Sequence, residues 1–275
     1  MGKEKEKKKK KETGKTFLQT VKKGLPVTLM VVAILLCWET AVWLFDLQPW
    51  LLPPPSRVLG ELHAERTVLL RHSLRTLSEA LLGLGIAIAS GLALGAVIFY
   101  IPLLRKTLYP LLVASQTVPM VVLAPLLVIW FGYGLLPKIL VVILSCFFPI
   151  AINTVTGLQS VDPDLIRLFQ SFGAKSVTIF RIAQWPAAIP AILSGTKVAA
   201  SYAVMAAVVG EWMGSNSGLG VYIIRSAHSF LTARVFAGIL LVSVYSIILF
   251  ATVGLIEKKA VFWQYDISHD GGFQS

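Results

Sequence analysis

Six long apolar stretches dominate the hydrophobic pattern of this chain. A membrane-spanning helix needs about 20 predominantly apolar residues. The stretches that reach or approach this length are Pro26–Phe45, Gly83–Tyr100, Leu111–Trp130, Leu135–Val155, Pro190–Met213 and Phe236–Ile256. Lys138 and Lys197 lie toward the ends of the fourth and fifth stretches, where a long side chain can reach the membrane surface. The pattern predicts an all-α integral membrane protein with six transmembrane helices.

Small residues recur at every fourth position in the second and fifth stretches. The positions are Gly83, Ala87, Gly91 and Gly95 in the second, and Gly195, Ala199, Ala203 and Ala207 in the fifth. Small side chains on one helical face let backbones approach closely in lipid, where no hydrophobic force drives helices together. We therefore expect two helix-packing stripes, which indicate contact between helices and not chemistry.

The composition supports a lipid environment. Of 275 residues, 56% are hydrophobic and 14% are charged, whereas an average soluble domain has about 25% charged residues. A soluble core of this size could not bury so much apolar surface. Cys37 and Cys146 both lie inside apolar stretches, so we expect them to act as small hydrophobic residues and not as a disulfide pair.

The net charge of +11 is concentrated at the N-terminus. Residues 1–25 hold ten Lys and three Glu with little apolar content, so we expect a disordered basic tail. Such a tail could contact acidic lipid or nucleic acid. The apolar stretch that follows it directly favours the simpler interpretation, a cytoplasmic flank of the first span with no nucleic-acid partner.

The orientation follows from placing that tail in the cytoplasm. Ile101–Pro110, Gln159–Pro186 and the C-terminal tail over residues 258–275 then face the cytoplasm. Asp46–Leu82, Phe131–Leu135 and Gly214–Arg234 face outward. The sequence predicts a multi-pass protein with both termini in the cytoplasm.

The cytoplasmic loop Gln159–Pro186 carries a predicted amphipathic helix. Asp162 is a suitable N-cap, Pro163 suits the first helical position, and Gly173 is placed to end the helix in a left-handed conformation. A second helix starts at Ser176, and Pro186 closes the loop. The apolar residues at helical spacing are Leu165, Leu168, Phe169 and Phe172. Such a helix either lies on the lipid headgroups or fills a groove in a soluble partner.

This loop resembles that of the type I permeases of binding-protein-dependent ABC importers. Their loop carries EAA, three residues, Gly, nine residues and then I-x-L-P, and Gly173 and Pro186 stand at the matching spacing. The EAA positions hold Arg167, Leu168 and Phe169, which loosens the motif. Ala183 and Trp185 likewise replace the I and L of the pattern.

The flanking segments carry a closer resemblance. Gln116–Gly134 (QTVPMVVLAPLLVIWFGYG) and Gly210–Gly220 (GEWMGSNSGLG) are similar to the sulfonate, nitrate and taurine branch of that family. The likeness implies a permease core over residues 71–257, with the first span and an outer loop over residues 26–70. It also implies a bacterial inner-membrane homodimer with two copies of a separate ATPase subunit and an extracytoplasmic substrate-binding protein.

The resemblance further implies that the loop helix is a coupling helix seated in a groove of the ATPase. ATP binding would draw two such helices together and switch the permease pair from inward- to outward-facing. The residues implied in ATPase coupling are Asp162, Pro163, Leu165, Arg167, Leu168, Phe169, Phe172, Gly173 and Ala174.

Polar groups inside the apolar stretches are candidates for the solute path, because they are costly in lipid. Glu211 continues the stripe of the fifth stretch, and the alternative for it is an interfacial carboxylate paired with Arg225 or Arg234. Gln116, Thr117 and Asn153 either bond between helices or line the path. The candidate path residues are Gln116, Thr117, Asn153, Met205 and Glu211.

Three further features of the membrane part have ordinary interpretations. Glu39 in the first span reaches the outer surface, or has a functional role. Arg75 and Glu79, four residues apart, form a helix-surface pair. Pro119 and Pro125 are placed to kink the third span.

The sequence predicts no catalytic residue, no metal site and no cofactor. The Gly14-Lys15-Thr16 run imitates a phosphate-binding loop, but position 9 holds Lys where that pattern needs Gly. The histidines are scattered, at positions 63, 72, 228 and 269. We expect a transport subunit and not an enzyme, with ATP hydrolysed by another chain. The rival hypothesis is an ATP-independent carrier or channel, although no internal symmetry supports a carrier.

The solute is predicted from resemblance and charge. The segments SQTVP, FGYGLLPK, SVDPDLIRL and GEWMG look most like permeases for thiamine-precursor pyrimidines. Riboflavin importers are close, and sulfonate, taurine or nitrate-type anions are the further alternative. The predicted path has few cations besides Lys197, which suits a neutral aromatic solute better than an anion.

Overall fold

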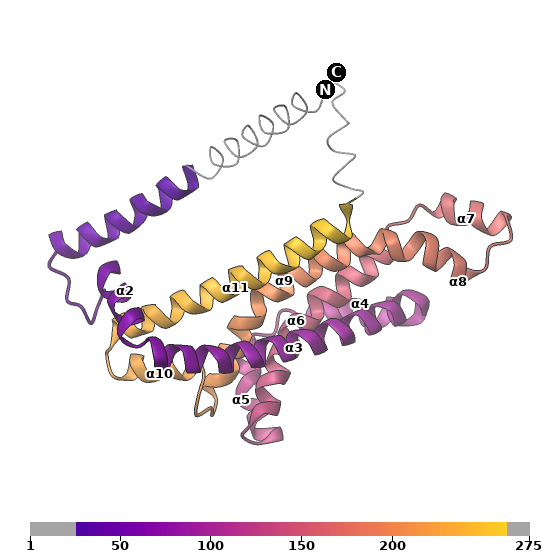
Figure 1. Cartoon of the computed structure of the whole chain (residues 1–275). Coiled ribbons are helices and arrows are strands. Elements are labelled where there is room, and N and C mark those ends of the chain that lie inside the picture. Colours follow the sequence, from indigo (N-terminus) through magenta and orange to yellow (C-terminus); the bar gives the residue numbers. More distant parts are fainter. Residues whose placement is uncertain (1–25, 263–275) are drawn as a thin grey trace, which may run out of the picture.

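The computed structural model describes residues 26–262 (Figure 1), and every regular element among them is a helix. An N-terminal helix, Pro26–Leu44, precedes the labelled elements. The others are α2 (Pro55–Ala64), α3 (Arg66–Tyr100), α4 (Pro102–Ser115), α5 (Met120–Phe131), α6 (Leu135–Leu158), α7 (Pro163–Ser171), α8 (Ser176–Ile179), the π-helix η1 (Phe180–Gln184), α9 (Trp185–Trp212), α10 (Leu219–His228) and α11 (Thr232–Ala260). The predicted disordered tail and most of the C-terminal tail lie outside the described residues.

Five of these helical segments are long and apolar enough to cross a membrane. They are Pro26–Leu44, Arg66–Tyr100, Leu135–Leu158, Ser176–Trp212 and Thr232–Ala260. A sixth span is available if α4 and α5 are counted together. The predicted fold class, an all-α integral membrane protein, is confirmed.

The third predicted span, Leu111–Trp130, is interrupted at Pro119, where a kink was expected, and the interruption is a sharp bend between two helices. The chain bends by 102° between α4 and α5. Pro119 lies at the bend with an extended backbone, φ −66° and ψ 121°. Proline has no N–H to continue the helix and disfavours helical geometry in the residue before it. Pro125, in contrast, lies inside α5 and does not end it.

The expectation that Pro186 closes the cytoplasmic loop was also wrong. The chain runs from α8 through η1 into α9 without leaving helical geometry. The π-helix provides the reason: the Trp185 N–H bonds to the Phe180 carbonyl, five residues earlier. Proline has no N–H to donate, and Pro186 lies in the first turn of α9, directly after the π-helix, where a missing donor is tolerated.

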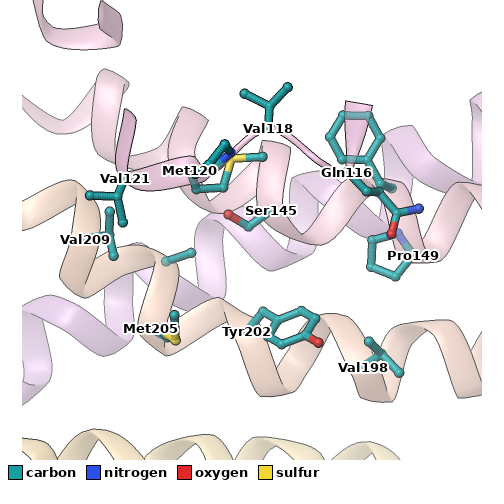
Figure 2. A pocket seen from close by; sticks show the side chains of 13 residues that line it. Gln116, Val118, Met120, Val121, Ser145, Pro149, Val198, Tyr202, Met205 and Val209 are labelled. Atoms are coloured by element: carbon teal, nitrogen blue, oxygen red, sulfur yellow. The ribbon is translucent and has the colours of Figure 1, made fainter. Parts of the chain in front are cut away.

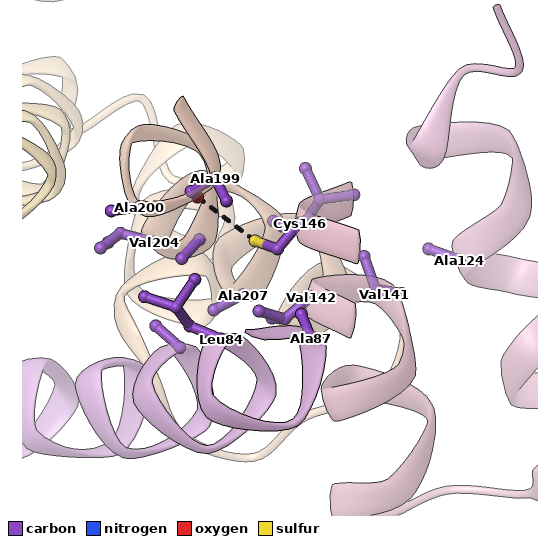
Figure 3. Close-up of a cluster of buried hydrophobic side chains, with 14 of the residues drawn as sticks. Leu84, Ala87, Ala124, Val141, Val142, Cys146, Ala199, Ala200, Val204 and Ala207 are labelled. Carbon is purple, nitrogen blue, oxygen red and sulfur yellow. Dashed lines mark hydrogen bonds between the residues drawn. The ribbon is translucent and has the colours of Figure 1, made fainter. Parts of the chain in front are cut away.

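The core forms where α3 and α9 both pack on α6. Most of its buried side chains are small or β-branched, including Ala87 of α3, Val142 of α6 and Ala203 of α9. In Figure 3 the Cys146 thiol lies between these helices, and its Sγ is 3.3 Å from the carbonyl oxygen of Ala199. The buried Cys146 therefore acts as a small packing residue, as expected.

Both small-residue stripes contact α6, which confirms the packing prediction. A Cβ added to Gly83 would lie 2.5 Å from the Cβ of Val142, and one on Gly195 would lie 2.7 Å from the Pro149 carbonyl oxygen. Contacts this short leave no room for a side chain. The stripes thus hold both α3 and α9 against α6, and they fix the frame on which the site is built.

The close approach of α3 and α6 at Gly95 leads to a prediction about the stability of the protein. A Cβ there would lie 2.6 Å from the Thr154 Cβ and 3.0 Å from the Ala151 carbonyl oxygen. We expect Gly95→Val to lower the free energy of unfolding by about 1–3 kcal/mol, because the helices must move apart. Thermal unfolding of the purified protein in detergent measures the change.

Gly85 of the same helix supplies the matched control. Nothing lies within 4 Å of a Cβ added there. Gly85→Ala should leave the unfolding temperature unchanged or raise it slightly, since alanine favours helix. Equal losses at the two positions would contradict the packing role assigned to the stripe.

Candidate functional site

The helix α7 projects from one end of the bundle, opposite the end that carries α2 and α10 (Figure 1). Asp162 caps it as predicted: its Oδ1 accepts a hydrogen bond from the Asp164 N–H at 2.8 Å. Its C-terminus also has the predicted form, with Gly173 at φ +77°. The Ala174 N–H bonds back to the Phe169 carbonyl and the Gly173 N–H to that of Gln170. These two bonds satisfy the last carbonyls of the helix.

The apolar residues of α7 are largely uncovered. None of its residues is buried. Leu165 and Leu168 are about half exposed, and Phe172, at the C-cap, is 79% exposed. The Arg167–Asp164 ion pair on its surface is exposed and adds little stability. An amphipathic helix that leaves its apolar residues unburied has a surface suited to docking.

A cavity of about 510 Å³ lies between the bend after α4, the middle of α6 and one face of α9. Figure 2 shows Gln116, Met120 and Ser145 on one side of it and Tyr202 and Met205 on the other. The lining residues are uncharged throughout. Tyr202 and Met205 are more than half exposed, so the α9 side of the cavity is open.

The predicted path residues separate into two groups. Gln116 and Met205 line the cavity. Thr117 and Asn153 are outside its lining, and each satisfies a carbonyl of its own helical turn: Thr117 Oγ1 donates to Ala114 and the Asn153 amide to Pro149. Glu211 is buried elsewhere, 2.7 Å from Thr76 Oγ1.

Neither arginine proposed as an alternative partner reaches Glu211. Arg234 instead pairs with Glu61 and Glu65 of the α2 region, at 3.2 and 2.7 Å. Within residues 26–262 Glu211 has no ion pair, and Arg225 has none either.

Ser145 and Tyr202 are cavity residues that sequence reasoning missed. Ser145 donates to the Val141 carbonyl at 2.8 Å, which leaves the lone pairs of its oxygen available to a solute. The signal for Tyr202 was present in the sequence. Val198, Tyr202, Met205 and Val209 recur at helical spacing and all line the cavity, on a face adjacent to the small-residue stripe.

The two lysines of the apolar stretches, Lys138 and Lys197, both pair with carboxylates of the protein. Lys138 is 5% exposed and its Nζ lies 2.6 Å from Glu79 Oε1. Glu79 is fully buried, so its pair with Arg75 is not a simple surface pair. Lys197 of α9 pairs with Glu257 of α11 at 2.5 Å.

Glu39, in the last turns of the N-terminal helix, has a structural partner in α2. Its carboxylate accepts from the Ser56 N–H at 3.0 Å and from the Ser56 hydroxyl at 2.7 Å. Ser56 is in the first turn of α2, where backbone N–H groups lack helical partners. The carboxylate therefore holds α2 to the first span.

Comparison with known proteins places these features in a family. Residues 82–261 match the family described as "Binding-protein-dependent transport system inner membrane component". The chain is 35% identical to the formylaminopyrimidine transport permease of Halalkalibacterium halodurans, over 88% of this chain and 96% of that protein. It is 36% identical to the riboflavin transport system permease of Chloroflexus aurantiacus, over 88% and 90%. It is 31% identical to the taurine transport system permease of Escherichia coli, over 88% and 91%.

The fold is found in a solved transporter. Inward-facing structures of the MetNI methionine ABC transporter include a chain that superposes with a TM-score of 0.63 at 17% identity, covering 72% of this chain and 98% of that one. At this identity the likeness establishes the fold alone. Together with the sequence matches over most of its length, it shows that this chain belongs to the binding-protein-dependent inner membrane components and is a permease subunit of an ABC importer.

Proposed function

We propose that this permease imports a neutral heteroaromatic solute of the thiamine-precursor pyrimidine class through the cavity beside α9. The observation that carries the proposal is the absence of charge in the cavity lining of the described chain. Lys197 precedes Val198 of that lining, but Glu257 neutralises it. An anionic solute would require a compensating cation when it leaves water. A neutral ring requires only apolar contact and a few hydrogen bonds, which Gln116, Ser145 and Tyr202 supply.

The similarity to a formylaminopyrimidine permease supports this choice of solute. Riboflavin is the second candidate, because a riboflavin permease is equally similar and riboflavin also carries a planar ring system. Taurine is less favoured because its sulfonate would enter the cavity without a cationic partner, although a taurine permease is also related.

The proposal assigns the energy source to a separate ATPase that docks on α7. Its support is the exposed apolar surface of α7, carried at one end of the bundle. Two permease copies would bring their open α9 faces together and complete the cavity, with two ATPase subunits below. A substrate-binding protein would deliver the solute at the end that carries α10. This orientation puts both termini in the cytoplasm of a bacterial cell.

Transport by the reconstituted complex tests the proposal. Liposomes holding the permease with its ATPase and binding protein should accumulate labelled formylaminopyrimidine only when ATP is supplied. Riboflavin and taurine are offered in parallel, and the binding protein is titrated with each. Transport by the permease alone would identify an ATP-independent carrier, and preferential taurine uptake would contradict the assignment of a neutral solute.

A charge placed in the cavity tests whether it is the path, independently of the binding protein's selectivity. We expect Gln116→Glu to lower uptake of the pyrimidine roughly tenfold at unchanged amounts of assembled complex, because the solute must pass a carboxylate in an apolar cavity. Gln116→Met is the control of similar size and should retain most of the uptake. Equal behaviour of the two variants would place the path elsewhere.

A further inference from the structure

The first turn of α10 is bonded by side chains from two other helices. The backbone N–H of Gly218 donates to His72 Nδ1 at 2.9 Å, and that of Leu219 donates to Thr76 Oγ1 at 2.8 Å. The N–H of Gly220 donates to Glu211 Oε2 at 2.6 Å. Three successive N–H groups at the start of one helix are thus satisfied by α3, which carries His72 and Thr76, and by α9, which carries Glu211. We call His72, Thr76 and Glu211 the α10 cap.

The members of the α10 cap also bond to each other. Thr76 Oγ1 donates to Glu211 Oε1 at 2.7 Å while it accepts from Leu219. Both Thr76 and Glu211 are essentially fully buried. The hydroxyl therefore joins α3, α9 and α10 in one chain of hydrogen bonds. Removing it would leave a buried carboxylate oxygen and a buried N–H without partners.

The buried carboxylate of Glu211 is stabilised in part by α10. It has no ion pair within residues 26–262; its carboxylate accepts from the Thr76 hydroxyl and from the Gly220 N–H at the N-terminus of α10, where the helix dipole is positive, and Lys138 of α6 attracts it from farther away. The fit is tight: a Cβ on Gly218 would overlap the Glu211 carboxylate, and one on Gly220 would overlap the Val208 carbonyl oxygen. Glycine at both positions allows the close approach. Displacement of α10 would take the Gly220 N–H away from a carboxylate that is almost fully buried.

The position of α10 links this arrangement to transport. It lies at the end of the bundle opposite α7 and packs on α3, α9 and α11 (Figure 1). The α9 helix also forms one wall of the cavity, and Val209 of that wall is two residues from Glu211. A shift of α10, or of α3 relative to α9, must break bonds of the α10 cap. The cap therefore favours one arrangement of the end of the cavity that lies away from α7.

We propose that the α10 cap is a latch: His72, Thr76 and Glu211 are positioning residues that keep α10 seated on α3 and α9 in the resting transporter. The latch opens when the loaded binding protein and ATP together favour the outward-facing state. This inference rests on the proposed ATP-driven import, because the hydrogen bonds of the α10 cap would have to break in each transport cycle. Weakening the latch should let the transporter cycle without cargo.

The test compares Thr76→Val with Ser73→Ala in the complete transporter. Valine keeps the shape of threonine and removes the hydroxyl. Ser73 lies one turn earlier on α3, is equally buried, and its hydroxyl has no partner among the described residues, so its removal is the matched control. For Thr76→Val we expect ATP hydrolysis without binding protein to rise by about fivefold or more, because the loss of even one of its two hydrogen bonds to Glu211 and Leu219 is worth that much. The number of solute molecules moved per ATP should fall. Ser73→Ala should match the unmodified protein, and Thr76→Ser should restore coupling.

A distance measurement separates positioning from general stability. Spin labels at Leu70 of α3 and Ala227 of α10 should give one narrow distance in the resting protein and a broader, longer distribution in Thr76→Val. His72→Phe removes the Gly218 acceptor at a less buried site, keeps a ring beside Tyr222, and serves if Thr76→Val does not fold. The latch would be overturned if the label distances in Thr76→Val equalled those of the unmodified protein. It would also be overturned if uptake and ATP hydrolysis fell in parallel in both Thr76→Val and His72→Phe.

The two proposals fail in different ways. A complex that hydrolyses ATP but moves no pyrimidine would contradict the proposed solute. The label distances in the permease would still decide the latch, because they require no solute. If the label distances in Thr76→Val equalled those of the unmodified protein, the latch would be rejected even if pyrimidine uptake were fully ATP-dependent.

Discussion

Phe172→Asp should abolish ATP-driven uptake while the permease remains folded in the membrane. Phe172 is 79% exposed at the end of α7, and its ring makes the largest apolar contribution to that helix's exposed surface. An aromatic side chain that anchors an interface often carries much of the binding energy, and a carboxylate in its place would have to be desolvated. We expect a loss of about 100-fold in uptake rate, the scale of a lost hot spot.

The variant also separates the two interpretations of α7. If the helix docks on an ATPase, the ATPase should no longer co-purify with Phe172→Asp, and its hydrolysis should lose stimulation by the loaded binding protein. Gln170→Asp is the control, because Gln170 is exposed and polar in the same helix. Normal uptake and normal ATPase retention in Phe172→Asp would refute the docking role and leave α7 as a helix that lies on lipid headgroups.

Lys138→Met should strongly destabilise the folded permease. Lys138 Nζ donates to Glu79 Oε1 at 2.6 Å and to Ser215 Oγ at 3.0 Å. Without it Glu79, which is fully buried, keeps only Arg75 as a cationic partner. A buried carboxylate that loses such a partner costs about 3 kcal/mol or more. The expected result is a loss of this size in the free energy of unfolding in detergent.

The double variant Glu79→Gln with Lys138→Met provides the control. Removing both charges eliminates the uncompensated carboxylate, and replacing a buried ion pair by neutral groups is often close to neutral. We expect the double variant to recover most of the stability lost in Lys138→Met. Additive losses in this double-mutant cycle would mean that the two residues contribute independently.

Features encoded by nearby residues were predictable from the sequence. The start and end of α7 follow from Asp162, Pro163 and Gly173, whose conformational preferences act within one turn. The small-residue stripes depend on a period of four and were confirmed by their contacts with α6. The break at Pro119 was only partly predicted. Proline indicates where a helix is interrupted, but neighbouring packing decides between a kink and a bend of 102°.

Features formed by distant residues were not predictable. Lys138 and Glu79 are 59 positions apart, and nothing in either local sequence shows that they meet. The same holds for Glu211 and Thr76, which are 135 positions apart. A single sequence therefore identified Glu211 as a costly buried carboxylate but not its partners. The residues of the cavity were only partly predicted, for the same reason. Gln116 and Met205 were predicted as path residues, whereas Ser145 is recognised only once α6 is seen to pack beside α9.

The unbroken helical run Ser176–Trp212 connects the segment that follows α7 with the wall of the cavity. Its 37 residues form a rod about 55 Å long at the usual rise per residue. One end carries the arm on which α7 is mounted, and the middle carries Tyr202 and Met205. If a subunit docks on α7 as proposed, its movement would pass to Tyr202 and Met205 through continuous helix, because no loop lies between them and the segment after α7.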